Sequence, residues 1–144
     1  MNQHHKIQKI INNLDLDLSG LTVLTELASE PYLYNIKLSI MASAKVICVG
    51  KDSSFGDFQT IKVRLNKYLS KQELEKIEIF KNSCPEDLLG SVDIVTNSGF
   101  LRPINKRVIE KLKRTSVIAL MWEVWEFRNN DLDLKCCQEN NIPV

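Results

Sequence analysis

Residues 91–144, SVDIVTNSGFLRPINKRVIEKLKRTSVIALMWEVWEFRNNDLDLKCCQENNIPV, carry the pattern from which the fold is predicted. The segment contains two apolar strand patterns, at 92–96 and 117–121, and each is followed by a polar loop and a helical pattern. A strand, helix and strand in succession form a right-handed crossover and a parallel sheet. Both loops then lie at the carboxyl ends of strands, where open parallel sheets bind their ligands.

The residues before this segment repeat the alternation of strand and helix. Strands are predicted over 21–27, 45–50 and 75–81, and helices over 31–41 and 57–69. Further elements are predicted as a helix over 6–18, a helical turn over 84–90, helices over 105–114 and 131–140, and the start of a sixth strand at 142–144. We therefore expect residues 1–144 to form one flavodoxin-like α/β unit with three layers. Its mainly parallel sheet has five to six strands and helices on both faces, and residues 1–20 form an N-terminal packing helix.

The charge balance excludes the usual polyanionic partners. Lys and Arg number 19 against 18 Asp and Glu, a formal net charge of +1, whereas a nucleic-acid surface needs clustered basic residues. The densest basic group, within 106–114, is interleaved with apolar residues at the spacing of a solvated helix face. The longest apolar run, 117–122, is too short to span a bilayer, and the N-terminus lacks the apolar core of a signal peptide. We expect a cytoplasmic protein that binds neither nucleic acid nor membrane.

Cysteine and histidine provide no expected metal site or nucleophile pair. Cys48, Cys84, Cys136 and Cys137 lack the spacing of zinc ligands, and such free cysteines suit a reducing compartment. The two histidines, His4 and His5, lie in a terminus that we expect to be frayed, so no histidine can activate a serine in the folded body.

Within residues 91–144, five runs match a known family in order and spacing. They are Asp93–Ser98, Ile104–Leu112, Lys113–Ile118, Asn130–Leu134 and Asn141–Val144. They resemble the substrate-binding domain, often called the catalytic domain, of the D-isomer-specific 2-hydroxyacid dehydrogenases. The resemblance covers the last 54 residues by these runs and the first 90 by overall pattern only. It implies that the loops at 97–99 and 122–130 face an interdomain cleft that receives the substrate carboxylate. Ser98, Gly99, Trp122 and Glu123 are then the nearest counterparts of substrate contacts.

The resemblance also implies NAD or NADP, held in that family by a domain that follows this one and that carries the catalytic Arg, Glu and His. This sequence has five glycines and no Gly-x-Gly, so we expect no cofactor site in this chain and assign no catalytic residue. In the second loop, Trp-Glu-Val-Trp-Glu at 122–126 replaces the family's Gly-x-Gly. That bulk and charge would crowd and repel a small carboxylate.

The residues at the predicted carboxyl ends of the strands form one polar edge with two indole rings, as expected of a small-molecule cleft. They are Thr25, Glu26, Ser29, Lys51, Asp52, Ser53, Ser54, Asn82, Asn97, Ser98, Arg102, Trp122, Glu123, Trp125, Glu126 and Arg128. The predicted substrate-binding residues are Ser98, Gly99, Arg102, Trp122, Glu123 and Glu126. Glu123 and Glu126 could share a proton or bind a cation, and ion pairs with Arg102 and Arg128 are the alternative.

Two main functional hypotheses follow. The first is the substrate-binding domain, or a remnant of it, of an NAD-dependent 2-hydroxyacid dehydrogenase-like oxidoreductase, catalytically incomplete by itself. Its partners are a carboxylate or related small molecule and a nucleotide-binding domain. The alternative is a stand-alone α/β module that binds a ligand or a protein through residues 122–128. Self-association through the last strand is a further possibility, because exposed strand edges pair readily.

Overall fold

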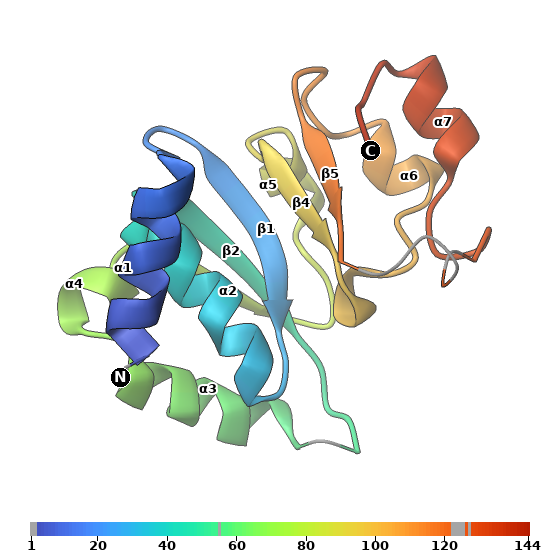
Figure 1. Ribbon diagram of the computed structural model, residues 1–144. Helices are drawn as coiled ribbons and strands as arrows, with labels where there is room; N and C mark the ends of the chain where they lie inside the picture. The colour runs from blue at the N-terminus through green and yellow to red at the C-terminus, as the bar shows by residue number, and fades with distance from the viewer. Residues whose placement is uncertain (1–2, 55, 122–125, 127) are drawn as a thin grey trace.

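The structure is a computed structural model that describes residues 3–54, 56–121, 126 and 128–144. Its centre is one sheet of five parallel strands in the order β3-β2-β1-β4-β5 (Figure 1). The strands are β1 (Thr22–Leu27), β2 (Lys45–Gly50), β3 (Ile77–Lys81), β4 (Ile94–Asn97) and β5 (Val117–Leu120). The predicted α/β class with a parallel sheet is confirmed. The strand order reverses between β1 and β4, which is the arrangement of doubly wound sheets.

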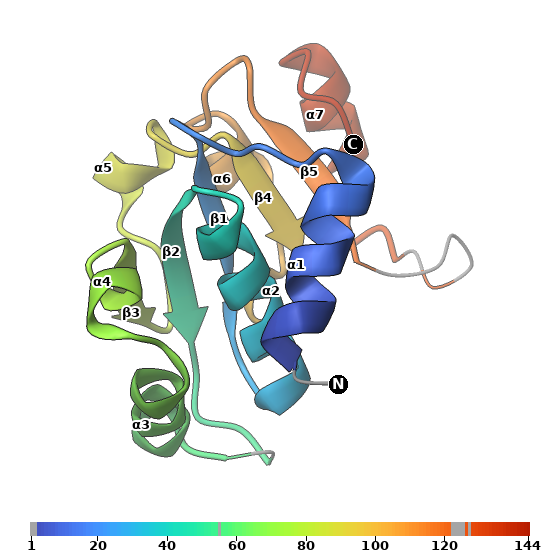
Figure 2. The ribbon, with the colours of Figure 1, turned by 60° about the vertical axis from the view of Figure 1, so that its left-hand side comes forward.

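Helices cover both faces of this sheet, as expected. They are α1 (Gln3–Leu14), α2 (Glu30–Met41), α3 (Phe58–Tyr68), α4 (Lys71–Leu74), α5 (Glu86–Leu89), the 3-10 turn η1 (Gly99–Leu101), α6 (Lys106–Ile109) and α7 (Leu134–Glu139). Figures 1 and 2 show α2 and α3 on one side of the sheet and α6 and α7 on the other. In the part of the chain that the structure describes, no helix has the length and apolarity needed to cross a bilayer.

Successive side chains of β2 contribute to the hydrophobic core on opposite faces of the sheet. Val46 and Cys48 join the cluster beneath α2 and α3, whereas Ile47 and Val49 join the cluster beneath α5, α6 and α7. Successive side chains of a strand point to opposite faces, so a nearly continuous apolar run is what a strand covered on both sides requires. Cys48 is fully buried, and burial raises the pKa of its thiol. It is a core residue.

The N-terminal helix packs on α2 rather than directly on the sheet. Ile7 and Ile11 of α1 form a small apolar cluster with Ala42, which follows α2. The helix predicted over 6–18 spans Gln3–Leu14 instead, because Asp15 adopts a positive φ of 50° that ends it. The chain beyond the helix still lies against α2, since the Leu18 amide donates to the Ala42 carbonyl at 2.7 Å.

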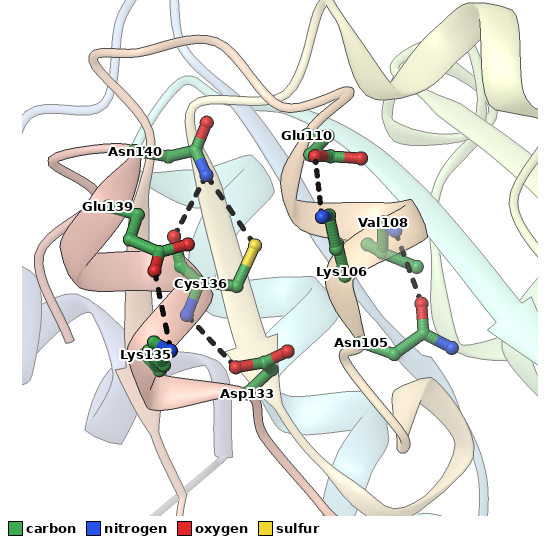
Figure 3. A network of polar contacts seen from close by, with 9 residues as sticks. All are labelled: Asn105, Lys106, Val108, Glu110, Asp133, Lys135, Cys136, Glu139 and Asn140. Carbon is green, nitrogen blue, oxygen red and sulfur yellow. Dashed lines mark hydrogen bonds and ion pairs between the residues drawn. The ribbon is translucent and has the colours of Figure 1, made fainter.

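The two short C-terminal helices begin at capping side chains (Figure 3). The Asn105 side chain accepts from the Val108 amide at 3.3 Å, and the Asp133 carboxylate accepts from the Cys136 amide at 2.9 Å. Both residues satisfy amides that a first helical turn leaves unpaired. At the other end of α7, the side-chain Nδ2 of Asn140 donates to the Cys136 carbonyl at 2.9 Å.

Two predictions for the C-terminal half are wrong, one in the length of a helix and one in the existence of a strand. The helix predicted over 105–114 ends at Ile109, after which turns carry Leu112 into the core and the Lys113 ammonium to within 2.7 Å of an Asp93 oxygen. The sixth strand predicted at 142–144 does not form. The Ile118 amide donates to the Pro143 carbonyl at 2.9 Å, but proline has no amide to continue a ladder.

Candidate functional site

The candidate site lies where the sheet changes winding direction, beside the carboxyl ends of β1 and β4. The chain leaves β1 toward α2, on one face, and leaves β4 through η1 toward α6, on the opposite face (Figure 1). Connections that diverge from two neighbouring strands leave a crevice at the strand ends. The polar residues Glu26 of β1 and Asn97 of β4 end up at this point, with 2% and 0% of their surface exposed.

Glu26 is the buried acid of the site. One of its carboxylate oxygens, Oε2, accepts from the Phe100 amide at 2.7 Å. Burial raises the pKa of this carboxyl above its ordinary value, because a charge loses solvation when it is removed from water. The Phe100 amide and the cations Arg102 and Lys51 oppose that rise without cancelling it. Glu26 therefore anchors η1 and holds its proton more tightly than a solvated glutamate.

Arg102 links the end of β4 to the segment that follows β5. Its Nε donates to Asn97 Oδ1 at 3.3 Å, and its Nη2 donates to the Asn97 carbonyl at 3.1 Å. Its Nη1 lies 3.6 Å from Asp131 Oδ2. A guanidinium fixed at three points has little rotamer freedom left to lose when a ligand arrives.

The loops after β4 and β5 are joined by backbone hydrogen bonds as well. The Ile104 amide donates to the Asp131 carbonyl at 2.9 Å, and the Asp133 amide donates to the Ile104 carbonyl at 3.1 Å. Ile104 and Leu132 form an isolated parallel bridge and are each 1% exposed. The described part of the second loop is therefore fixed to the first.

A cavity of about 230 Å³ opens beside η1, on the β2 and β3 side. Among the described residues, its lining is Leu24, Val49, Lys51, Asn82, Ser83, Cys84, Leu89, Val95, Phe100, Leu101, Arg102, Pro103, Ile104 and Val108. The inner wall is aliphatic, and the polar lining comes from the strand ends. Such an arrangement suits a small molecule with an apolar body and a polar head.

Lys51 supplies the available cation of this cavity. It directly follows β2 and is half-buried, and its charge acts on Glu26. No described residue forms a hydrogen bond or an ion pair with its ammonium group. A partly desolvated ammonium at a cavity wall favours an anionic ligand group.

The structure distributes the six predicted site residues unevenly. Arg102 lines the cavity, and Gly99 is exposed at the start of η1. Ser98 is 2% exposed, and its hydroxyl lies 3.5 Å from that of Thr96, so it faces the interior. Glu126 is exposed. Trp122 and Glu123 lie outside the described residues, and a substrate-binding role stays a prediction for all six.

Three residues of the candidate site belonged to the predicted polar edge but were not singled out from it: Glu26, Lys51 and Asn82. A fourth, Asp131, was not part of that edge. The signal for Glu26 was present, because it is the charged residue inside the apolar strand run LTVLTEL. A carboxylate in a buried strand needs hydrogen bonds or a functional reason. Nothing local marks Lys51 or Asp131, because their neighbours come from distant segments.

The first β–α turn does not fit a nicotinamide dinucleotide. It carries Ala28 and Ser29 where a pyrophosphate needs close approach to glycine, and Ala28 is 8% exposed. Pro31 in the first turn of α2 removes one of the amides that would hold a phosphate. Nor do three metal-ligating side chains cluster anywhere in the described ranges.

Comparisons with known proteins bear on the fold alone. No family model matches the sequence, and no curated protein matches it. Among solved structures, a dipicolinate synthase chain from Bacillus halodurans is similar with a TM-score of 0.61 and 14% identity, covering 99% of this chain and 43% of that one. Shikimate 5-dehydrogenase from Listeria monocytogenes, in complex with shikimate and NAD, is similar with a TM-score of 0.60 and 10% identity, covering 99% and 51%.

A third similar structure is the NADPH-dependent glyoxylate/hydroxypyruvate reductase from Sinorhizobium meliloti, with a TM-score of 0.54 and 13% identity, covering 97% of this chain and 44% of that one. The chain thus spans about half or less of each of these proteins. Fold similarity at such low identity transfers no activity. The chain has the fold of one part of NAD(P)-dependent dehydrogenases and of a dipicolinate synthase.

Proposed function

We propose that this chain is the substrate-binding unit of an NAD(P)-dependent oxidoreductase related to the D-2-hydroxyacid dehydrogenases. The observation that carries the proposal is the cavity beside the switch point of the sheet, which has two cations, Lys51 and Arg102, in its lining. The charges of both cations also act on the buried carboxyl of Glu26. The likeness in fold to the glyoxylate/hydroxypyruvate reductase supports it.

The chain's own residues bind and orient the substrate in this proposal. Lys51 and Arg102 receive the substrate carboxylate, and the aliphatic wall formed by Val49, Leu89 and Val95 receives its carbon chain. Gly99 and Glu126 stay predicted substrate contacts, as do Trp122 and Glu123, which lie outside the described residues. Hydride transfer is the chemistry that a nicotinamide supplies, and its binding belongs to another domain because the first β–α turn here does not suit it.

The end strand of the sheet carries exposed apolar side chains that suit a partner surface. Val117, Leu120 and Met121 are 37%, 41% and 43% exposed, although they belong to or directly follow the apolar strand β5. Exposed apolar groups gathered on one strand favour contact with another protein surface. A nucleotide-binding domain or a second copy of the chain would cover them in the proposed assembly.

Ligand titration by NMR tests the proposal. D-2-Hydroxybutyrate is titrated against the wild type, with its uncharged methyl ester as the probe control. We expect the acid to bind and the ester to bind at least about tenfold more weakly, because the ester lacks the charge that Lys51 attracts.

The variant Lys51→Gln should lose most of this preference, whereas Lys135→Gln should retain it. Lys135 is a matched control because its side chain is 86% exposed on α7 and does not line the cavity. Equal binding of acid and ester, or no binding of either, contradicts the proposal.

A further inference from the structure

A second cavity lies on the opposite face of the sheet, between α2 and α3. Its volume is about 370 Å³, and it is lined by Leu33, Tyr34, Arg64, Lys67 and Tyr68. Figures 1 and 2 show α2 and α3 on the side of the sheet opposite α6 and α7. The cavity is therefore separate from the site at the switch point, and the two cavities have no described lining residue in common.

Two aromatic rings form its wall. The Tyr34 and Tyr68 rings meet edge to face, with centroids 6.0 Å apart and planes at 64°. The Lys37 ammonium lies 5.7 Å from the Tyr68 centroid and 2.6 Å from Glu73 Oε1. Lys37 and Glu73 neutralise each other, and with Tyr34 they hold the Tyr68 ring in place.

Several cations lie along α3 and at the start of α4. Lys62, Arg64 and Lys67 lie on α3 and Lys71 begins α4. None of these four forms an ion pair with a described residue, and α3 itself contains no acidic residue. The segment after Asn105 differs, because a carboxylate oxygen lies within 4.0 Å of each of four of its cations: Lys106, Arg107, Lys111 and Lys113.

We propose that this α2–α3 cavity binds an anionic group attached to a planar ring, with a phosphate monoester as the anion. Arg64 and Lys67 are spaced three apart on α3, so they lie on one side of the helix and bind the anion together. A guanidinium matches two phosphate oxygens at once, and an ammonium adds a point charge. Tyr34 offers a ring face to the planar part of the ligand, as aromatic side chains do in sequence-tolerant base binding.

Three probes separate the parts of this recognition. AMP carries both ring and phosphate, ribose 5-phosphate carries the phosphate without the base, and adenosine carries the ring without the phosphate. In calorimetric titrations of the wild type we expect AMP to bind most tightly. Amide shifts in an NMR titration with AMP should fall on α2 and α3.

The variants identify the groups. The double substitution Arg64→Gln/Lys67→Gln should weaken AMP binding by at least about tenfold, which corresponds to ~1.4 kcal/mol. The matched control, Lys106→Gln/Lys135→Gln, removes the same charge from exposed positions and should change the affinity less than about twofold. Tyr34→Leu should weaken AMP binding but leave ribose 5-phosphate binding unchanged.

Several outcomes would overturn the proposal. One is the absence of AMP binding up to roughly 10 mM ligand, where the binding free energy has become very small. Another is adenosine binding as tightly as AMP. A third is an equal loss of AMP affinity in the two double variants. Amide shifts confined to the switch point would also overturn it. The variant Lys51→Gln, which tests the proposed substrate site, should leave AMP binding intact, so the two proposals fail separately.

Discussion

The substitution Glu26→Gln tests whether the switch-point acid is a buried charge that destabilises the fold at neutral pH. Gln has nearly the same shape and keeps a carbonyl oxygen to accept from the Phe100 amide, which donates to Glu26 at 2.7 Å. The change therefore removes the charge and retains the contact. We expect the free energy of unfolding at pH 7 to increase, because burial, the largest cause of the raised pKa, acts against the ionised form.

The pH dependence has a definite sign. The pKa of Glu26 is higher in the folded protein than in the unfolded chain, so the folded state binds the proton more tightly. Wild-type stability due to this group is fully present below the unfolded pKa, about 4.3, and is lost as the pH rises through the folded pKa. Above that pH window, each unit of difference between the two pKa values lowers the wild-type free energy of unfolding by ~1.4 kcal/mol.

The magnitude of the hydrogen bond comes from a second variant. Glu26→Ala leaves the Phe100 amide without its buried acceptor, which costs roughly 1–3 kcal/mol more than Gln does. For a chain of this length, that difference corresponds to a fall in Tm of about 3–10 °C.

Urea unfolding of the three proteins between pH 4 and pH 8 measures these differences. Other carboxyls titrate alike in wild type and variant, so the difference in stability isolates Glu26. The reasoning is refuted if the gap between Glu26→Gln and wild type does not change with pH, or if it narrows as the pH rises.

Three further predictions concern the scaffold. Asp93→Asn should destabilise the fold by roughly 1 kcal/mol, because the Asp93 carboxylate accepts from the Thr22 amide and from Lys113. The pKa of Asp93 is lowered in the folded protein, so urea unfolding should show a smaller difference in stability between wild type and variant at pH 3 than at pH 7. Gly50→Ala should lower the Tm, because the new Cβ would lie 2.6 Å from Phe58 Cδ2 and 3.1 Å from the Leu27 carbonyl oxygen. Gly20→Ala is the comparison: its Cβ would have no neighbour within 4 Å, so any loss there reports the strain of a side chain at a φ of +79° and not steric overlap. Ile36→Ala, at 0% exposure, should cost about 2–5 kcal/mol in denaturant unfolding, and Val63→Ala, at 43% exposure, less than about 1; similar losses at both positions would contradict the assigned core.

The local patterns of the chain were sufficient for the class of fold. The continuous apolar run of β2 predicted a strand covered on both faces, and the strands after 92 and 117 predicted parallel crossovers; both are observed. Such patterns succeed because burial follows the period of the strand or helix, which neighbouring residues alone define. Boundaries were less accurate, as the shortened helix at Ile109 shows, because contacts with Asp93 and the core decide where that helix ends.

From the sequence alone, polar residues could be predicted to gather at the carboxyl ends of parallel strands, with Glu26, Lys51 and Arg102 on that edge. The folded arrangement was needed to show that Glu26 is buried against the Phe100 amide and that Asp131 meets Arg102. It also brings α2 and α3 together as the walls of a second cavity. The residues of each contacting pair are 29 to 74 positions apart in the sequence, so no local sequence pattern could predict the contact. The pKa of a group and the shape of a cavity depend on the atoms that surround them in space, which only the tertiary structure brings together.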